Sequence, residues 1–118
     1  MCVDINEEKV KSLSAGKITI YEPGLEVIFH RNIEKKRLEF TTDLAKAVDF
    51  GDIIFLALPT PEGEDGSADL SYIIDVANKL GNLIKKYKII IDKSTVPVGT
   101  AEMVHNAIAK NISEELFD

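Results

Sequence analysis

The 118-residue sequence is poor in cysteine, in basic residues and in long apolar runs, and each shortage excludes a class of protein. Its single cysteine, Cys2, cannot close an internal disulfide, which fits a reducing compartment. Its net charge of −6 argues against general binding to the phosphate backbone of nucleic acids. No apolar stretch approaches the roughly 18 residues of a membrane span, and no basic segment leads into an apolar one as in a signal peptide. We therefore expect a cytoplasmic protein with no nucleic-acid and no membrane partner.

Metal-binding patterns are also scarce. The two histidines, His30 and His105, show no local metal-ligand spacing. The acidic residues between Glu62 and Asp69 lack the spacing of a calcium-binding loop, so a solvated loop explains them better. The sequence therefore predicts no metal site. It also contains no internal repeat or linker, and its length fits one domain with a modest core.

Short apolar strands alternate with amphipathic helices along the chain. This alternation predicts parallel βαβ units and an α/β fold with a doubly wound parallel sheet. The run Ile53–Leu58 is apolar throughout and too short for a buried helix, so it predicts a strand covered on both faces. The expected strands are Cys2–Val3, Leu38–Phe40, Ile53–Leu58 and Ile89–Ile91.

Capping residues and periodic apolar positions place the helices between these strands. Residues 60–68 are expected to form a loop because of their proline and glycine content. The expected helices are one capped by Asn6, with Val10 and Leu13 inward and Gly16 at its end; one with Pro23 in its first turn and Leu25, Ile28, Phe29 and Ile33 on one face; a short one capped by Thr42 or Asp43; one capped by Asp69 with Leu70, Ile73, Ile74, Ala77, Leu80 and Ile84 on one stripe; and a last one after Gly99.

Polar side chains follow three of the expected strands at the point where each strand ends. Asp4 follows the first strand, Thr60 follows the third between two prolines, and Ser94 and Thr95 follow the fourth. The carboxyl ends of parallel strands share one edge of the sheet, and ligands of open α/β sheets bind there. An acid at this edge typically accepts hydrogen bonds from ribose hydroxyls. Lys9, one turn into the following helix, would add a positive charge near the ribose or a phosphate.

Each of these residues also has a purely structural explanation. Asp4 can be a solvated residue at a strand end, and Lys9 can lie on a solvated helix face. Thr60 can serve the turn between its flanking prolines. Ser94 and Thr95 can act as N-cap-like residues for the last helix. Their joint placement at strand ends favours a binding site more than any single residue does.

Six short sequence blocks occur in an order and at spacings typical of one enzyme family. The blocks are Val3-Asp4-Ile5-Asn6, Tyr21-Glu22-Pro23-Gly24-Leu25, Thr41-Thr42-Asp43, Pro59-Thr60-Pro61, Gly63–Leu70 and Ser94-Thr95-Val96-Pro97-Val98-Gly99-Thr100. Together they resemble the NAD-binding domain of UDP-glucose 6-dehydrogenases, in the wider UDP-glucose/GDP-mannose dehydrogenase family. The resemblance covers essentially the whole chain.

The resemblance implies a fold, an activity and a role for four residues. The fold would be an incomplete Rossmann-like sheet, and the full-length enzyme, expected to be a homo-oligomer, would oxidise the C6 alcohol of UDP-glucose to a carboxylate in two hydride transfers to NAD. Asp4 and Lys9 look like the contacts to the adenosine ribose, and Thr60 looks like the threonine beside the dinucleotide. Thr95 looks like the catalytic threonine that contacts NAD and helps hold a water at the reacting carbon.

The sequence also departs from the family pattern. The family opens with a strand and a Gly-x-Gly-x-x-Gly turn that cradles the pyrophosphate, and this pattern does not occur in the 118 residues, nor do the family's catalytic cysteine, lysine and asparagine segments. We therefore expect residues 1–118 to be a partial NAD-binding domain, inactive and weak in NAD binding by itself. It would be marginally stable, because each buried backbone group without its ladder partner costs about 1–3 kcal/mol.

Two other interpretations stay open at the level of sequence. One is a nucleotide-sugar dehydrogenase that acts on GDP-mannose or UDP-N-acetylmannosamine, because the residues that read the sugar lie outside these blocks. The other is a non-catalytic nucleotide-binding module.

Overall fold

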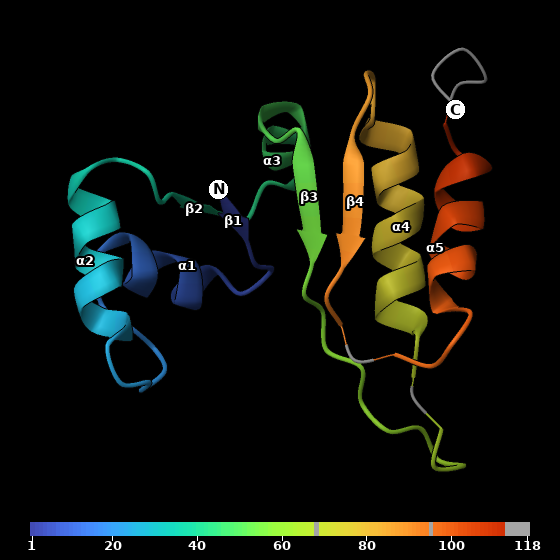
Figure 1. The fold of residues 1–118 in the computed structure, drawn as a ribbon, viewed down its shortest axis with the longest axis horizontal. Coiled ribbons are helices and arrows are strands. Elements are labelled where there is room, and N and C mark those ends of the chain that lie inside the picture. Colours follow the sequence, from blue (N-terminus) through green and yellow to red (C-terminus); the bar gives the residue numbers. More distant parts are fainter. Residues whose placement is uncertain (68, 95, 113–118) are drawn as a thin grey trace. The chain divides into compact units, whose positions relative to one another are not determined.

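The computed structural model describes residues 1–67, 69–94 and 96–112, and the chain divides into two compact units, Met1–Phe50 and Gly51–Asp118. Both units combine strands with helices, and in the first unit α1 and α2 follow one another between β1 and β2 (Figure 1). In chain order the elements are β1 (Cys2–Val3), α1 (Glu7–Ser14), α2 (Leu25–Glu34), β2 (Phe40–Thr41), α3 (Leu44–Phe50), β3 (Ile53–Leu56), α4 (Ser71–Leu83), β4 (Ile89–Asp92) and α5 (Thr100–Ala109).

In the first unit, β1 pairs in parallel with β2, with Val3 opposite Thr41. Helix α1 follows β1 after three residues, and its N-cap is Asn6, whose Oδ1 accepts a hydrogen bond of 3.1 Å from the N–H of Lys9. The cap satisfies one of the backbone donors that a helix start leaves unpaired. The predicted cap at Asn6 is therefore confirmed, as is the strand that ends before Asp4.

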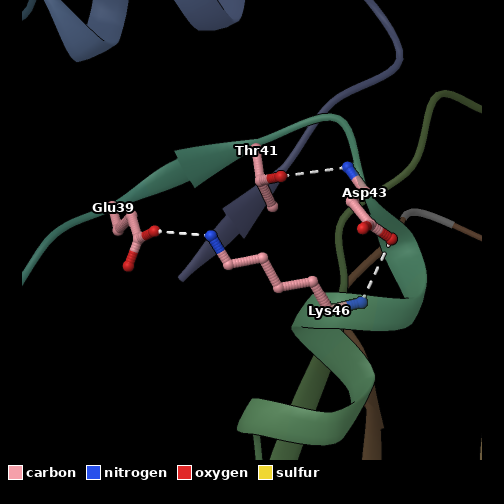
Figure 2. A network of polar contacts seen from close by, with 4 residues as sticks. All are labelled: Glu39, Thr41, Asp43 and Lys46. Carbon is pink, nitrogen blue, oxygen red and sulfur yellow. Dashed lines mark hydrogen bonds and ion pairs between the residues drawn. The ribbon is translucent and has the colours of Figure 1, made fainter.

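A polar network fixes the passage from β2 into α3 (Figure 2). Thr41 Oγ1 accepts the N–H of Asp43 at 3.0 Å, and Asp43 Oδ1 accepts the N–H of Lys46 at 3.1 Å. Lys46 Nζ also forms an ion pair of 3.0 Å with Glu39 Oε1. Of the two predicted cap residues, Thr42 and Asp43, the structure thus selects Asp43. Helix α3 buries Val48.

Helix α2 begins later than predicted. Pro23 lies before the helix, in a turn closed by a 3.1 Å hydrogen bond from the N–H of Leu25 to the carbonyl of Glu22. Gly24 has φ +82° and ψ −13°, so Pro23 and Gly24 occupy the central positions of a type II turn, which demands glycine at the second. Phe29 is buried, but Ile28 is 49% exposed, so the predicted inward position of Ile28 is wrong.

In the second unit, β3 pairs in parallel with β4 from Ile53 opposite Ile89 to Leu56 opposite Asp92. Helices α4 and α5 lie side by side next to this pair (Figure 1). The stripe predicted for α4 forms the core: its most buried members, Ile73, Ala77 and Leu80, are fully inaccessible to solvent. Gly81, also buried, lies where α4 meets the end of α5.

The prediction that β3 is covered on both faces is wrong for this structure. Ile53 and Phe55 are 53% and 61% exposed, whereas Leu56 is 4% exposed. Successive side chains of a strand point to opposite faces, so one face of β3 is packed and the other is open. A continuous apolar run is typical of a strand that is buried on both faces. In the second unit, other elements pack against only one face of β3.

The remaining predictions for this unit need small corrections only. Asp69 Oδ1 accepts the N–H of Ser71 at 2.9 Å, but the N-cap position of α4 is Leu70. Helix α5 follows Gly99, as predicted. Both sheets are parallel and alternate with helices, which confirms the α/β class; the described strands pair as β1 with β2 and β3 with β4. Among residues 1–67, 69–94 and 96–112, none of the helices has both the length and the apolar character to cross a bilayer.

Candidate functional site

Asp4 lies at the carboxyl end of β1, directly before α1. Its own N–H donates to the carbonyl of Thr41 at 3.1 Å, which extends the β1–β2 ladder by one bond and holds the residue at the strand end. Its Oδ1 accepts the N–H of Asn6 at 2.9 Å, and its Oδ2 lies 3.4 Å from Lys9 Nζ. The structure therefore brings Asp4 and Lys9 together, as the sequence predicted.

These contacts favour the ionised form of the Asp4 carboxyl. The N–H of Asn6 lowers its pKa most, desolvation opposes the shift, and Lys9 lowers it further. An ionised carboxylate accepts hydrogen bonds only, and its two oxygens have room for about four. Since the Asp4 side chain is 36% exposed, acceptor capacity remains open to solvent. Asp4 can therefore bind a vicinal diol such as that of a ribose.

Ser94 connects the ends of β3 and β4 in the second unit. Its Oγ accepts the N–H of Leu58 at 3.0 Å and donates to the carbonyl of Leu56 at 3.2 Å. Asp92 Oδ1 accepts the N–H of Ser94 at 3.0 Å. The structure corrects the helix-capping alternative for Ser94, because α5 begins at Thr100 with Gly99 as its N-cap. Sequence reasoning missed this bridge.

Of the two predicted threonines, the structure describes Thr60 and not Thr95. Thr60 is half-buried in the loop after β3, two residues beyond Leu58. Thr95 lies outside the described residues, so its predicted catalytic and NAD-binding role stays a prediction. The convergence of Asp4 with Thr60 on one ligand also stays a prediction.

The acidic loop before α4 is held by its own side chains. Asp65 Oδ1 accepts the hydroxyl of Ser67 at 2.6 Å and its N–H at 3.1 Å. The hydroxyl of Ser67 is the main cause of the lowered pKa of Asp65. Within residues 1–67, 69–94 and 96–112, no group of three acidic, histidine or cysteine side chains could hold a metal ion.

A cavity of the second unit reaches the end of β4 at Asp92. Its volume is about 320 Å³, and its mixed lining includes the apolar side chains of Ile90, Val104 and Ile108 together with polar ones such as Lys88 and His105. Neither Thr60 nor Ser94 belongs to its lining. Of the residues at the end of β4, Asp92 lines this cavity, whereas Ser94 does not.

Parallel strands followed by helices, with an acid at the carboxyl end of one strand, are features that dinucleotide-binding α/β domains share. Residues 1–118 match the model of the UDP-glucose/GDP-mannose dehydrogenase family, NAD binding domain. The chain belongs to this family. The ionised Asp4 carboxylate, with Lys9 beside it, offers hydrogen-bond acceptors of the kind that ribose hydroxyls need.

Several relatives carry the same kind of domain. UDP-glucose 6-dehydrogenase TuaD of Bacillus subtilis is 44% identical over 110 residues, which cover 93% of this chain and 24% of that protein. UDP-glucose 6-dehydrogenase of Pseudomonas aeruginosa is 47% identical over 107 residues, which cover 91% and 24%. The structure of a UDP-glucose dehydrogenase from the hyperthermophilic archaeon Pyrobaculum islandicum matches with a TM-score of 0.87 and 40% identity, covering 92% of this chain and 26% of that one. The chain thus spans about a quarter of the length of the curated relatives it matches.

Proposed function

We propose that residues 1–118 form the cofactor-binding part of an NAD-dependent UDP-glucose 6-dehydrogenase, which oxidises UDP-glucose to UDP-glucuronate. Family membership and the names of the two relatives at 44% and 47% identity support this proposal. The observation that carries it is the half-exposed Asp4 carboxylate at the end of β1, next to Lys9. NAD, when bound, accepts a hydride from the sugar C6 in each of two successive oxidations.

Asp4 holds the two hydroxyls of the adenosine ribose in this proposal. Its carboxylate oxygens accept both, and the N–H of Asn6 keeps the side chain in one orientation. A phosphate on the ribose 2′-hydroxyl would meet the same negative charge, so NAD is preferred over NADP. Lys9 reduces the net charge at the site and keeps the carboxylate ionised.

Thr60 and Thr95 act at the nicotinamide end. Thr60 lies beside the dinucleotide, held between two prolines that fix the local backbone. Thr95 helps hold the water whose oxygen enters the carboxylate product. The protein works in the cytoplasm as a homo-oligomer, and its single cysteine suits that compartment.

The test uses the intact protein that carries these residues and follows NADH absorbance. UDP-glucose, GDP-mannose and UDP-N-acetylmannosamine are compared as substrates, and the highest kcat/KM is expected with UDP-glucose. Asp4→Ala is expected to raise KM for NAD about 10- to 100-fold, the range for loss of hydrogen bonds to a charged group. It should also narrow the preference for NAD over NADP.

Asp49→Ala is the matched control, since Asp49 is an exposed acid on α3 in the same unit. It should leave both quantities unchanged. Faster turnover of GDP-mannose would identify a different dehydrogenase of the family. No NADH with any of the three sugars, while NAD still binds, would indicate the non-catalytic module.

A further inference from the structure

We propose that Ser94 is a positioning residue for Thr60: its hydroxyl fastens the loop after β3 to the end of β4, and Asp92 orients it. The proposal rests on the proposed function, because Thr60 matters only if the dinucleotide lies beside it. The contacts that carry it lie within the second unit. They join residues 36 and 38 positions apart in the sequence.

The Ser94 hydroxyl acts both as a donor and as an acceptor in this bridge. It donates its proton to the carbonyl of Leu56 and accepts the N–H of Leu58. The Leu56 carbonyl also accepts the N–H of Lys93 at 2.8 Å, so the bridge continues the β3–β4 ladder where the strands end. Only a hydroxyl provides one donor and one acceptor on a single atom at this length, which limits the position to serine or threonine.

Asp92 holds the backbone from which the Ser94 hydroxyl extends. Its Oδ1 accepts the N–H of Ser94, which fixes the backbone of Ser94 relative to the last residue of β4. The other oxygen, Oδ2, is buried and has no hydrogen-bond partner among the described residues. Among the described residues, the hydrogen bond from the N–H of Ser94 is therefore the contact through which the Asp92 carboxylate supports the bridge.

The sequence transmits the position of Leu58 to Thr60. Leu58 and Thr60 each precede a proline, and a residue before proline is restricted to extended conformations. Pro59 between them has a fixed φ. Three consecutive residues thus have little backbone freedom, and anchoring the N–H of Leu58 sets the position of Thr60. Without the hydroxyl, the N–H of Leu58 loses this anchor.

The experiment measures two independent quantities in the intact protein. Amide hydrogen exchange at Leu58 is expected to accelerate about five- to tenfold in Ser94→Ala, the effect of losing one net hydrogen bond. KM for NAD should rise and kcat fall in the same variant. Ser94→Thr should restore both, since it keeps the hydroxyl. Asp92→Ala should behave like Ser94→Ala, and Asp92→Asn, which keeps an Oδ1 acceptor, like the unsubstituted protein.

Ser67→Ala is the control, because the hydrogen bond that its hydroxyl makes among the described residues, to Asp65, stays within its own loop. It should change neither quantity. Unchanged Leu58 exchange in Ser94→Ala would overturn the bridge, and faster exchange with unchanged kinetics would overturn the positioning role. Absence of NADH formation by the unsubstituted protein would instead refute the proposed function, while the Leu58 exchange would still decide the bridge.

Discussion

Replacing Gly81 with alanine is expected to destabilise the second unit. A Cβ at this position would lie 2.7 Å from the Cβ of Asn111 and 2.7 Å from the carbonyl oxygen of Ile108. Ordinary van der Waals contact begins near 3.4 Å, so α5 would have to move by about 0.7 Å. The Ile108 oxygen is backbone and cannot rotate away. The helices would separate where Asn111 Nδ2 donates to Asn78 Oδ1 at 2.9 Å.

Two opposing effects determine the magnitude. Alanine is favoured over glycine in a helix interior by about 1 kcal/mol. Overpacking of a tight contact costs about 1–3 kcal/mol, and a weakened hydrogen bond between Asn78 and Asn111 adds about 1 kcal/mol. The clash involves a carbonyl and a second Cβ, so overpacking wins. The free energy of unfolding should fall by about 1–3 kcal/mol, because the weakened hydrogen bond and the helix propensity of alanine roughly cancel.

Urea unfolding of the chain, followed by circular dichroism and by tyrosine fluorescence, measures this change. Tyr72 and Tyr87 lie in the second unit and Tyr21 in the first, so a Tyr21→Phe background restricts the fluorescence to the second unit. Asn82→Ala is the matched control, since Asn82 is the exposed neighbour on the same helix and bonds only to the carbonyl of Asn78. If Gly81→Ala raises the urea midpoint as Asn82→Ala should, the described packing of α4 on α5 is wrong.

Three further predictions concern other parts of the chain. Asn6→Ala removes the cap of α1 and should destabilise the first unit by about 1 kcal/mol, seen as a lower thermal midpoint, whereas Asn6→Asp should not. Phe55→Lys places a charge on the open face of β3 and should reduce aggregation on concentration, measured by light scattering, because exposed apolar strands template association; an unchanged signal would mean that this face does not drive aggregation. The pKa of Asp4 is lowered in the folded state, so its carboxylate stabilises the first unit above the unfolded-chain pKa of about 3.9 and loses this effect as pH falls through the lower folded-state pKa. Asp4→Asn should therefore flatten the loss of stability in acid, and an unchanged acid limb would show that the contacts with Asn6 and Lys9 do not stabilise the fold.

Elements set by local chemistry could be predicted from the sequence. Asn6 caps α1 because its side chain reaches a backbone N–H three residues on, a contact that needs nothing else in the fold. The stripe of α4 was predictable because helical spacing alone puts Ile73, Ala77 and Leu80 on one face. The paired placement of Asp4 and Lys9 follows equally from a strand end and one helical turn.

Features that depend on distant parts of the chain could not be predicted. Ser94 has the residue type and location of a helix cap, yet its hydroxyl bonds across the sheet to Leu56 and Leu58. No local pattern distinguishes these uses. The exposure of Phe55 depends on which elements pack against β3, and the apolar sequence of the strand does not specify those elements. Ile28 fits the apolar face of α2 by spacing but lies at the edge of what the small first unit can bury.

The glycines that precede α2 and α5 are required for their positive φ angles and not for lack of space around them. Gly24 and Gly99 have φ of +82° and +93°, and an added Cβ at either would meet no atom within 4 Å. An L-alanine there would be strained, whereas a D-alanine, which favours positive φ, would fit both the dihedral angles and the open space. Chemical synthesis of the chain with D-alanine at these two positions would reduce the freedom of the unfolded chain and leave every packed contact intact. Placing D-residues at these two positions is thus a way to stabilise this fold that the genetically encoded amino acids do not offer.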